Sequence, residues 1–156
     1  MRFGDAPIEG NRLQIKTQGT QMNSQMLFSA NTWYHIAFVC TGAKLYLYVN
    51  GQLDNSMDMP GKTTKVNTYT LCSGSSYTKG DAQFSEYRFW SKARTQKELQ
   101  NNMYVCDPTT EGLIFYYKMN EGSGFNFKDA SPHGYDCTTV DEAVPSWIQD
   151  VRIDGK

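Results

Sequence analysis

The chain has 156 residues, enough for one domain with its own hydrophobic core, and we expect a single domain over residues 1–156. The formal net charge is −1 and the basic residues are scattered, so the concentrated positive charge typical of nucleic-acid-binding and membrane-surface proteins is absent. No apolar run approaches the roughly 18 to 20 residues that span a bilayer, which argues against direct membrane insertion.

Short runs rich in aromatic and β-branched residues recur between turn residues and predict many short strands. Aromatic residues make up 13% of the sequence, whereas the helix-favouring residues Ala, Leu and Glu are sparse. In chain order, the predicted strands cover residues 12–17, 26–29, 33–40, 44–50, 67–72, 83–90, 113–119, 137–140 and 147–153. This pattern is typical of an all-β sandwich or barrel.

The clearest local unit is a β-hairpin made of residues 33–40 and 44–50, which are joined by a short link containing glycine. In the second strand, aliphatic residues alternate with Tyr46 and Tyr48, so the two kinds of side chain point to opposite faces. The aliphatic face is predicted to cover the core, and the tyrosine face to be amphipathic.

One helix is predicted near residues 95–103. Thr95 and Glu98 form a capping box, in which each side chain satisfies a backbone N–H at the start of the helix. Leu99 and Met103 are four residues apart, so they share the helix face that would dock on the sandwich.

Two clusters of turn residues follow in the C-terminal part of the chain. Residues 120–124 read Asn-Glu-Gly-Ser-Gly, and residues 129–134 combine Asp, Pro and Gly in the order expected of consecutive tight turns. The two glycines of the first cluster are not a phosphate-binding loop, because a third glycine and a following helix are missing.

The four cysteines are widely spaced and lack the paired spacing of zinc ligands, so no zinc site is expected. Cysteine is a good small core residue, and a domain of this length can fold without cross-links. We therefore expect mostly free, buried thiols at Cys40, Cys72, Cys106 and Cys137. Three disulfide connectivities stay open in an oxidising compartment.

Three segments together resemble the laminin G-like branch of the concanavalin A-like lectin/glucanase superfamily. Residues 33–51 are similar to the central hairpin of that family, with Trp-Tyr-His-Ile-Ala-Phe before Leu-Tyr-Leu-Tyr-Val-Asn-Gly. Residues 86–90, Glu-Tyr-Arg-Phe-Trp, resemble a family strand that precedes a short helix, and residues 113–129 resemble an edge segment of these domains. The resemblance implies a two-sheet antiparallel β-sandwich of the jelly-roll type.

By the same resemblance, the parent protein is exported and the chain works outside the cell or at the cell surface, as in bacterial surface proteins. The first residues, Met1 to Asp5, are too polar for a signal peptide. This composition agrees with a segment, for example the C-terminal one, of a longer secreted parent.

The function that the resemblance implies is a non-catalytic binding module for a glycan or a surface protein. An alternative of a different class is a structural or adhesion domain that supports a neighbouring domain and has no ligand of its own. Because one fold serves lectins, enzymes and scaffolds, the fold by itself does not decide between them.

A third alternative is a glycoside hydrolase of the same fold. Such enzymes place two carboxylates about 5 Å apart on alternate positions of a strand, commonly as Glu-x-Asp-x-Glu. No such triplet occurs, and Glu86 stands alone beside Arg88. His35 and His133 also lack a nucleophile and an orienting acid at suitable positions, so no catalytic residue is expected.

Calcium is a further expectation left open, because related domains sometimes bind it through loop oxygens. Three carboxylate groupings fall in predicted turns: Asp54 with Asp58, Asp129 near Asp136, and Asp141 with Glu142. No Asp-x-Asp-x-Asp-Gly loop is present, and turn-forming Asp is common without a metal, so no metal ligand is assigned.

The candidate ligand site is aromatic. Sugar recognition needs flat apolar faces for stacking beside planar polar groups for hydroxyls. Tyr46, Tyr48, Arg88 and Trp90 would supply both if their strands adjoin on the outer face of a sheet. The competing interpretation is that these rings pack in the core or at its rim.

Overall fold

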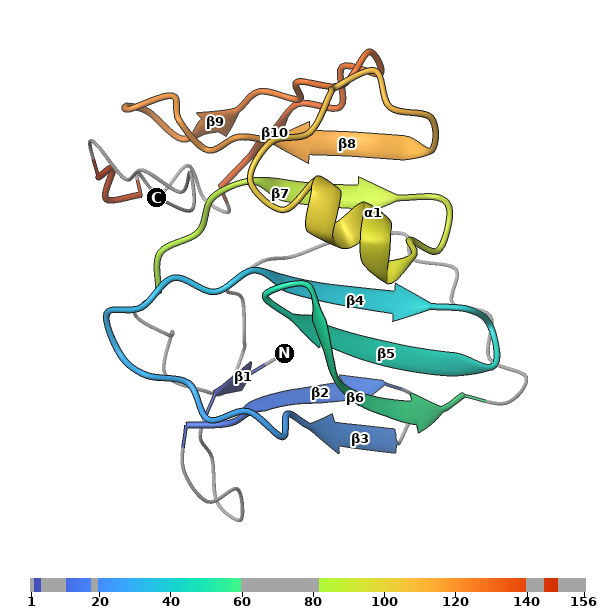
Figure 1. Cartoon of the computed structure of the whole chain (residues 1–156). Helices are drawn as coiled ribbons and strands as arrows, with labels where there is room; N and C mark the ends of the chain where they lie inside the picture. The colour runs from blue at the N-terminus through green and yellow to red at the C-terminus, as the bar shows by residue number, and fades with distance from the viewer. Residues whose placement is uncertain (1, 4–10, 18–19, 60–81, 140–144, 149–156) are drawn as a thin grey trace. The chain divides into compact units, whose positions relative to one another are not determined.

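The structure is a computed structural model that describes residues 2–3, 11–17, 20–59, 82–139 and 145–148 (Figure 1). Strands predominate within these residues, which form ten short strands and one helix. The chain divides into two compact units, Met1–Ala82 and Gln83–Lys156. The prediction of a chain built mainly of strands is confirmed. No helix in the described ranges has the length and apolar character needed to cross a membrane.

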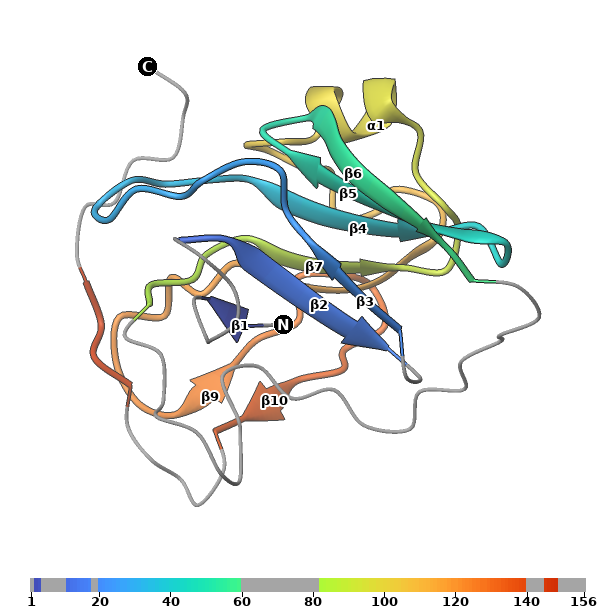
Figure 2. The same ribbon diagram turned by 90° about the horizontal axis from the view of Figure 1, so that it is seen from below.

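The first unit contains two antiparallel sheets, β1-β2-β3 and β4-β5-β6. Figure 2 shows β2 and β3 lying across from β4, β5 and β6. The pairing of β4 with β5 confirms the predicted hairpin. The strands are β1 (Arg2–Phe3), β2 (Leu13–Thr17), β3 (Thr20–Asn23), β4 (Ile36–Cys40), β5 (Lys44–Val49) and β6 (Gln52–Asp58).

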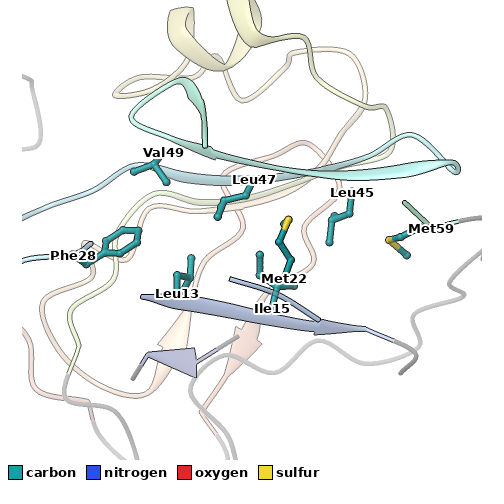
Figure 3. Packing of buried hydrophobic residues seen from close by; sticks show 8 residues of the cluster. All are labelled: Leu13, Ile15, Met22, Phe28, Leu45, Leu47, Val49 and Met59. Carbon is teal, nitrogen blue, oxygen red and sulfur yellow. The ribbon is translucent and has the colours of Figure 1, made fainter. Parts of the chain in front are cut away.

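The core of the first unit lies between these two sheets (Figure 3). Alternate residues of β5 point inward, and they meet alternate residues of β2 and a methionine of β3. Leu13 and Leu47 are completely buried at the centre. The cluster consists of Leu13, Ile15, Met22, Phe28, Leu45, Leu47, Val49 and Met59.

A bulge in β6 places a side chain that links the two sheets of the first unit. The register with β5 shifts at Leu47 and Tyr48, which leaves Asp54 without a partner residue on β5. The Asp54 carboxylate accepts the backbone N–H groups of Gln25 and Met26, each at 2.8 Å, just after β3. The prediction that Asp54 and Asp58 lie in a turn is therefore wrong, because both belong to β6.

The second unit contains two short antiparallel pairs, β7 with β8 and β9 with β10. One face of the first pair packs Cys106, Leu113 and Tyr116 into a small core, against which Trp90 and Ala130 lie. The strands are β7 (Tyr87–Trp90), β8 (Leu113–Tyr117), β9 (Asn126–Phe127) and β10 (Cys137–Thr138).

The other face of β7 and β8 is an aromatic ladder. Its ring centroids are 5.0 to 6.5 Å apart, a separation at which aromatic rings attract one another. The two rings from β8 are buried and the two from β7 are half-buried. The ladder consists of Tyr87, Phe89, Phe115 and Tyr117.

The predicted helix is present as α1 (Gln96–Asn101), and both hydrogen bonds of its capping box are formed. The Thr95 hydroxyl accepts the Glu98 N–H at 3.3 Å, and the Glu98 carboxylate accepts the Thr95 N–H at 2.8 Å. Leu99 is buried as predicted. The helix ends at Asn101 rather than Met103, because Asn102 leaves the helical conformation and its side-chain amide donates to the carbonyl of Glu98.

The strand predictions fail where polar residues form a strand or where apolar residues lie outside one. Strands β3 and β6 were not predicted, because their sequences, Thr-Gln-Met-Asn and Gln-Leu-Asp-Asn-Ser-Met-Asp, are mostly polar. Residues 26–29 are not a strand; Phe28 is buried in the core while its N–H donates to the carbonyl of Asn11 at 2.7 Å. Of the predicted strand 147–153, residues 147–148 are not in a strand, and residues 149–153, like 67–72, lie outside the described residues.

Candidate functional site

Tyr46 and Tyr48 lie next to each other on the face of β5 that points away from the core. Their ring centroids are 6.4 Å apart and both side chains are half-buried. The opposite residues on β6 are Ser56 and Leu53, and 51% of Leu53 is exposed. Two rings, an exposed aliphatic side chain and a hydroxyl therefore share one amphipathic face, which we call the β5 tyrosine face.

Arg88 on β7 is enclosed within the second unit. Its side chain is only 7% exposed, and its guanidinium donates to the Glu86 carboxylate and to the carbonyl of Asn102. The phenol of Tyr116 also donates to Glu86. Burial and this hydrogen bond raise the pKa of Tyr116 to about 12. A buried guanidinium with internal partners has few donors left for a ligand, which favours a structural role for Arg88.

Trp90 is also held by its neighbours. It pairs with Leu113 across a bulge and packs against the small core of the second unit. The guanidinium carbon of Arg94 lies 4.1 Å from the centroid of the Trp90 ring, within cation–π range, while Arg94 is ion-paired to Glu98 at 3.1 Å. This contact covers one face of the indole, and the ion pair with Glu98 links Arg94 to α1.

The four predicted ligand residues thus fall into two pairs. Tyr46 and Tyr48 belong to the first unit, and Arg88 and Trp90 to the second. The idea that all four form one surface stays a prediction. The internal contacts of Arg88 and Trp90 favour packing roles for these two residues. The β5 tyrosine face remains the candidate contact surface.

A second group of exposed rings lies in the segment that joins β9 to β10. We call residues 129–137 the Asp129 loop. Tyr135 is 57% exposed, His133 is also exposed, and their rings are nearly parallel, 9° apart in tilt and 5.6 Å apart between centroids. The sequence predicted tight turns here but did not single out the rings. The available signal was a pair of aromatic side chains flanking a turn glycine, Gly134, where no core needs to be filled.

The carboxylate of Asp129 organises this loop. Its Oδ1 accepts the N–H groups of Tyr116 and Ser131 at 2.8 and 2.9 Å, and its Oδ2 accepts the Ser131 hydroxyl and the Tyr135 N–H at 2.7 and 2.9 Å. Burial alone would raise the pKa of Asp129, but these donors outweigh it and hold that pKa below the usual range. Asp129 is therefore ionised at neutral pH and serves as a fixed acceptor.

The described carboxylates do not fit a calcium site. Asp58 is ion-paired to Lys44 at 3.1 Å, Asp136 to Lys128, and the oxygens of Asp54 and Asp129 accept backbone N–H groups. No group of three or more His, Cys, Asp or Glu suited to a metal occurs in the part of the chain that the structure describes. Asp141 and Glu142 lie outside that part.

The cysteines agree with the prediction only in part. Cys40, Cys106 and Cys137 are free, as expected, but only Cys106 is buried. Cys137 is half-buried, and burial raises the pKa of its thiol. Cys40 is exposed at the end of β4, so the prediction of a buried thiol is wrong there. Cys72 lies outside the described residues.

These features define a strand-rich domain that presents aromatic side chains on solvent-facing surfaces. Residues 5–100 match the laminin G family described as the concanavalin A-like lectin/glucanases superfamily. Because the match covers more than half of the chain, the chain belongs to this superfamily, and the resemblance read from the sequence is confirmed.

Two solved structures are similar to the chain. A candidate carbohydrate-binding protein from Bacteroides ovatus ATCC 8483 is 28% identical, with a TM-score of 0.61 over 86% of this chain and 42% of its own. This chain therefore spans less than half of that protein. An S-layer domain-containing protein from Clostridium thermocellum ATCC 27405 is 15% identical, with a TM-score of 0.36 over 58% of this chain and 49% of its own, too weak a likeness to establish a shared fold. No curated protein matches the chain.

Proposed function

We propose that the chain is a non-catalytic carbohydrate-binding module. The observation that carries this proposal is the similarity, at 28% identity over 86% of the chain, to the candidate carbohydrate-binding protein from Bacteroides ovatus. Membership of the lectin/glucanase superfamily supports the same assignment. Because the chain matches only 42% of that protein, the proposal concerns binding by this module and not the activity of a whole parent protein.

A single domain is part of the proposal. The family match over residues 5–100 runs across the boundary between Ala82 and Gln83, so one evolutionary unit includes strands from both compact units. We propose that residues 1–156 build one antiparallel two-sheet sandwich of the jelly-roll type. The two packed sheets of the first unit are the part of this architecture that supports it.

The proposed contact surface is the β5 tyrosine face. Tyrosine suits sugar recognition because its ring offers an apolar face and its hydroxyl can both donate and accept hydrogen bonds. Tyr46 and Tyr48 project from a central strand whose opposite face is anchored in the core. A ligand would therefore meet rings whose positions are already fixed, which lowers the entropic cost of binding.

The chemistry of the described carboxylates supports binding without hydrolysis. A glycosidase needs one carboxyl group with a raised pKa to act as the general acid. Hydrogen bonding from Lys128 and from the Asp129 N–H lowers the pKa of Asp136, and the pKa of Asp129 is also lowered. Glu86 accepts from Arg88 and Tyr116 inside the second unit. Neither aspartate has the raised pKa of a general acid, and the Glu86 carboxylate is occupied by internal hydrogen-bond donors.

We place the module outside the cell or at the cell surface, as part of an exported parent. Superfamily membership and the resemblance to bacterial surface modules support this placement. Its partners would be a glycan or a surface protein. Nucleic acid is disfavoured by the net charge of −1 and the scattered basic residues.

A glycan array tests the proposal directly. The purified chain is expected to bind at least one class of oligosaccharide and to release no reducing sugar from it during prolonged incubation. Tyr46→Ala and Tyr48→Ala should each weaken that binding, while Tyr104→Ala, which removes an exposed ring elsewhere, should not. Absence of binding across the array would favour the alternative of a structural domain. Release of reducing sugar would favour the alternative of a glycoside hydrolase.

A further inference from the structure

We infer that His133 and Tyr135 form a second stacking platform, separate from the β5 tyrosine face, for the apolar face of a neutral pyranose. The inference rests on the proposed carbohydrate-binding function and names a further site for it. It is carried by the exposure of two parallel rings, by the hydrogen bonds that brace their loop, and by the ion pair between Lys128 and Asp136, the residue that follows Tyr135.

The two rings stack against each other, and both residues are exposed. They tilt by only 9° relative to each other, and Tyr135 is 57% exposed. Between them lies Gly134, at φ +68°, a left-handed conformation that disfavours a side chain. A Cβ at this position would meet no atom of the described residues within 4 Å, so this part of the structure leaves the space beside the glycine open to an approaching ligand.

The loop that carries the rings is braced at several points. The Asp129 carboxylate accepts the Tyr135 N–H, and the Ser131 hydroxyl accepts the His133 N–H at 3.3 Å. The carbonyl of Tyr135 accepts the phenol of Tyr117, a buried ring of β8. The Tyr135 backbone is thus tied to β8, and the His133 backbone is tied to Ser131 within the loop, so little loop freedom would be lost on binding.

An exposed ion pair adjoins Tyr135 in the sequence. Asp136 follows Tyr135 in the sequence, its Oδ2 is paired with the ammonium of Lys128, and its Oδ1 accepts the Asp129 N–H at 2.9 Å. The side chains of Lys128 and Asp136 are 74% and 43% exposed, so both can also reach a ligand. An ammonium donor and a carboxylate acceptor match hydroxyl groups, which donate and accept.

The chemistry narrows the ligand class to a neutral sugar. The charges of Lys128 and Asp136 compensate each other, so neither a uronic acid nor an amino sugar gains net attraction from the pair. Two small rings present too little apolar area for a stable protein interface, which requires on the order of 800 Å² on each partner. A pyranose with its C–H bonds gathered on one face offers both the flat apolar surface and the rim of hydroxyls.

The test compares the full chain with three variants. Two probes are titrated into each protein by calorimetry. The neutral probe is the neutral oligosaccharide that binds best on the array, and the charged probe is a uronic-acid oligosaccharide of the same length. Tyr135→Ala should weaken binding of the neutral sugar roughly three- to tenfold, as expected for the loss of one ring contact. Tyr135→Phe keeps the ring and should stay within about twofold, and Tyr104→Ala should leave affinity unchanged.

Each outcome decides the matter. Binding by the wild-type chain that survives Tyr135→Ala but is lost in the Tyr46 and Tyr48 variants overturns the platform and leaves the proposed function intact. Stronger binding of the uronic-acid probe overturns the assigned ligand class. Absence of binding by the wild-type chain to either probe and to the array overturns both proposals. Because Tyr135 is largely exposed, thermal melting of Tyr135→Ala should match that of the wild type and confirm that the variant is folded.

Discussion

The Asp129 carboxylate joins Tyr116 of β8 to Tyr135 of the Asp129 loop by accepting both backbone N–H groups, at 2.8 and 2.9 Å. One short side chain therefore holds the exposed loop against a buried strand of the second unit. In the sequence, this Asp is recognisable only as a turn residue with some potential to bind calcium. Its four hydrogen-bond donors show instead that it is the acceptor around which the loop is built.

Replacing this carboxylate should be costly. Asp129→Ala leaves the N–H groups of Tyr116, Ser131 and Tyr135 without their acceptor, and hydrogen bonds to a charged group each contribute about 1.5 to 3 kcal/mol. We expect the free energy of unfolding to fall by at least about 2 kcal/mol, allowing for water at the exposed donors. Urea denaturation followed by fluorescence measures the loss.

Asp107 provides the control for this substitution. Among the described residues its carboxylate accepts from Thr109 alone, two positions along the chain, and Asp107 is exposed. Asp107→Ala should lower the free energy of unfolding much less than Asp129→Ala. Equal losses for the two variants would show that Asp129 is no more than an ordinary turn residue.

The same carboxylate should make stability depend on acid pH. The pKa of Asp129 is lowered in the folded protein, so its contribution is present above the unfolded pKa of about 3.9 and is lost as the pH falls through the lower folded value. Wild-type stability should therefore decline on acidification below about pH 4 more steeply than that of Asp129→Asn, which does not titrate. Denaturation series between neutral pH and about pH 2.5 test this, and parallel curves would contradict it.

Much of the fold could be predicted because the alternation of apolar and polar side chains along a strand indicates which face is buried. Leu45, Leu47 and Val49 alternate with two tyrosines, and the structure places the aliphatic side chains in the core and the tyrosines on the other face. The capping box at Thr95 is similarly local, since the two side chains and the N–H groups that they satisfy lie within one turn. Such local patterns can be recognised without any knowledge of the rest of the chain.

The unpredicted parts depend on partners that are distant in sequence. Strand β6 is polar and was taken for turns, but its pairing with β5 and the contacts of Asp54 with Gln25 and Met26 hold it in place. Arg88 is a predicted ligand residue because its planar guanidinium suits sugar hydroxyls if its strand presents it on the outer face of a sheet. Whether that face meets solvent depends on Asn102 and Tyr116, which lie 14 and 28 residues away.

The core of the first unit offers a matched pair of leucines on neighbouring strands. Leu47 on β5 is completely buried, so Leu47→Ala should leave a cavity and lower the free energy of unfolding by about 3 to 5 kcal/mol. Leu53 on β6 is 51% exposed, and Leu53→Ala should cost less than about 1 kcal/mol. Chemical denaturation of the two variants compares them; a similar small loss for both would place the core elsewhere.

The buried charge of Arg88 distinguishes packing from ligand recognition. Arg88→Ala leaves the Glu86 carboxylate with the Tyr116 phenol alone and should destabilise the chain by about 3 kcal/mol, since breaking one side of a buried pair strands the other charge. The double variant Glu86→Gln with Arg88→Met removes both charges and should recover a large part of this loss, because the remaining groups no longer need a counter-charge. Urea denaturation of the single and double variants gives the coupling, and the double variant should keep the glycan affinity of the wild type. Loss of affinity in a double variant that melts like the wild type would instead assign Arg88 to the ligand site.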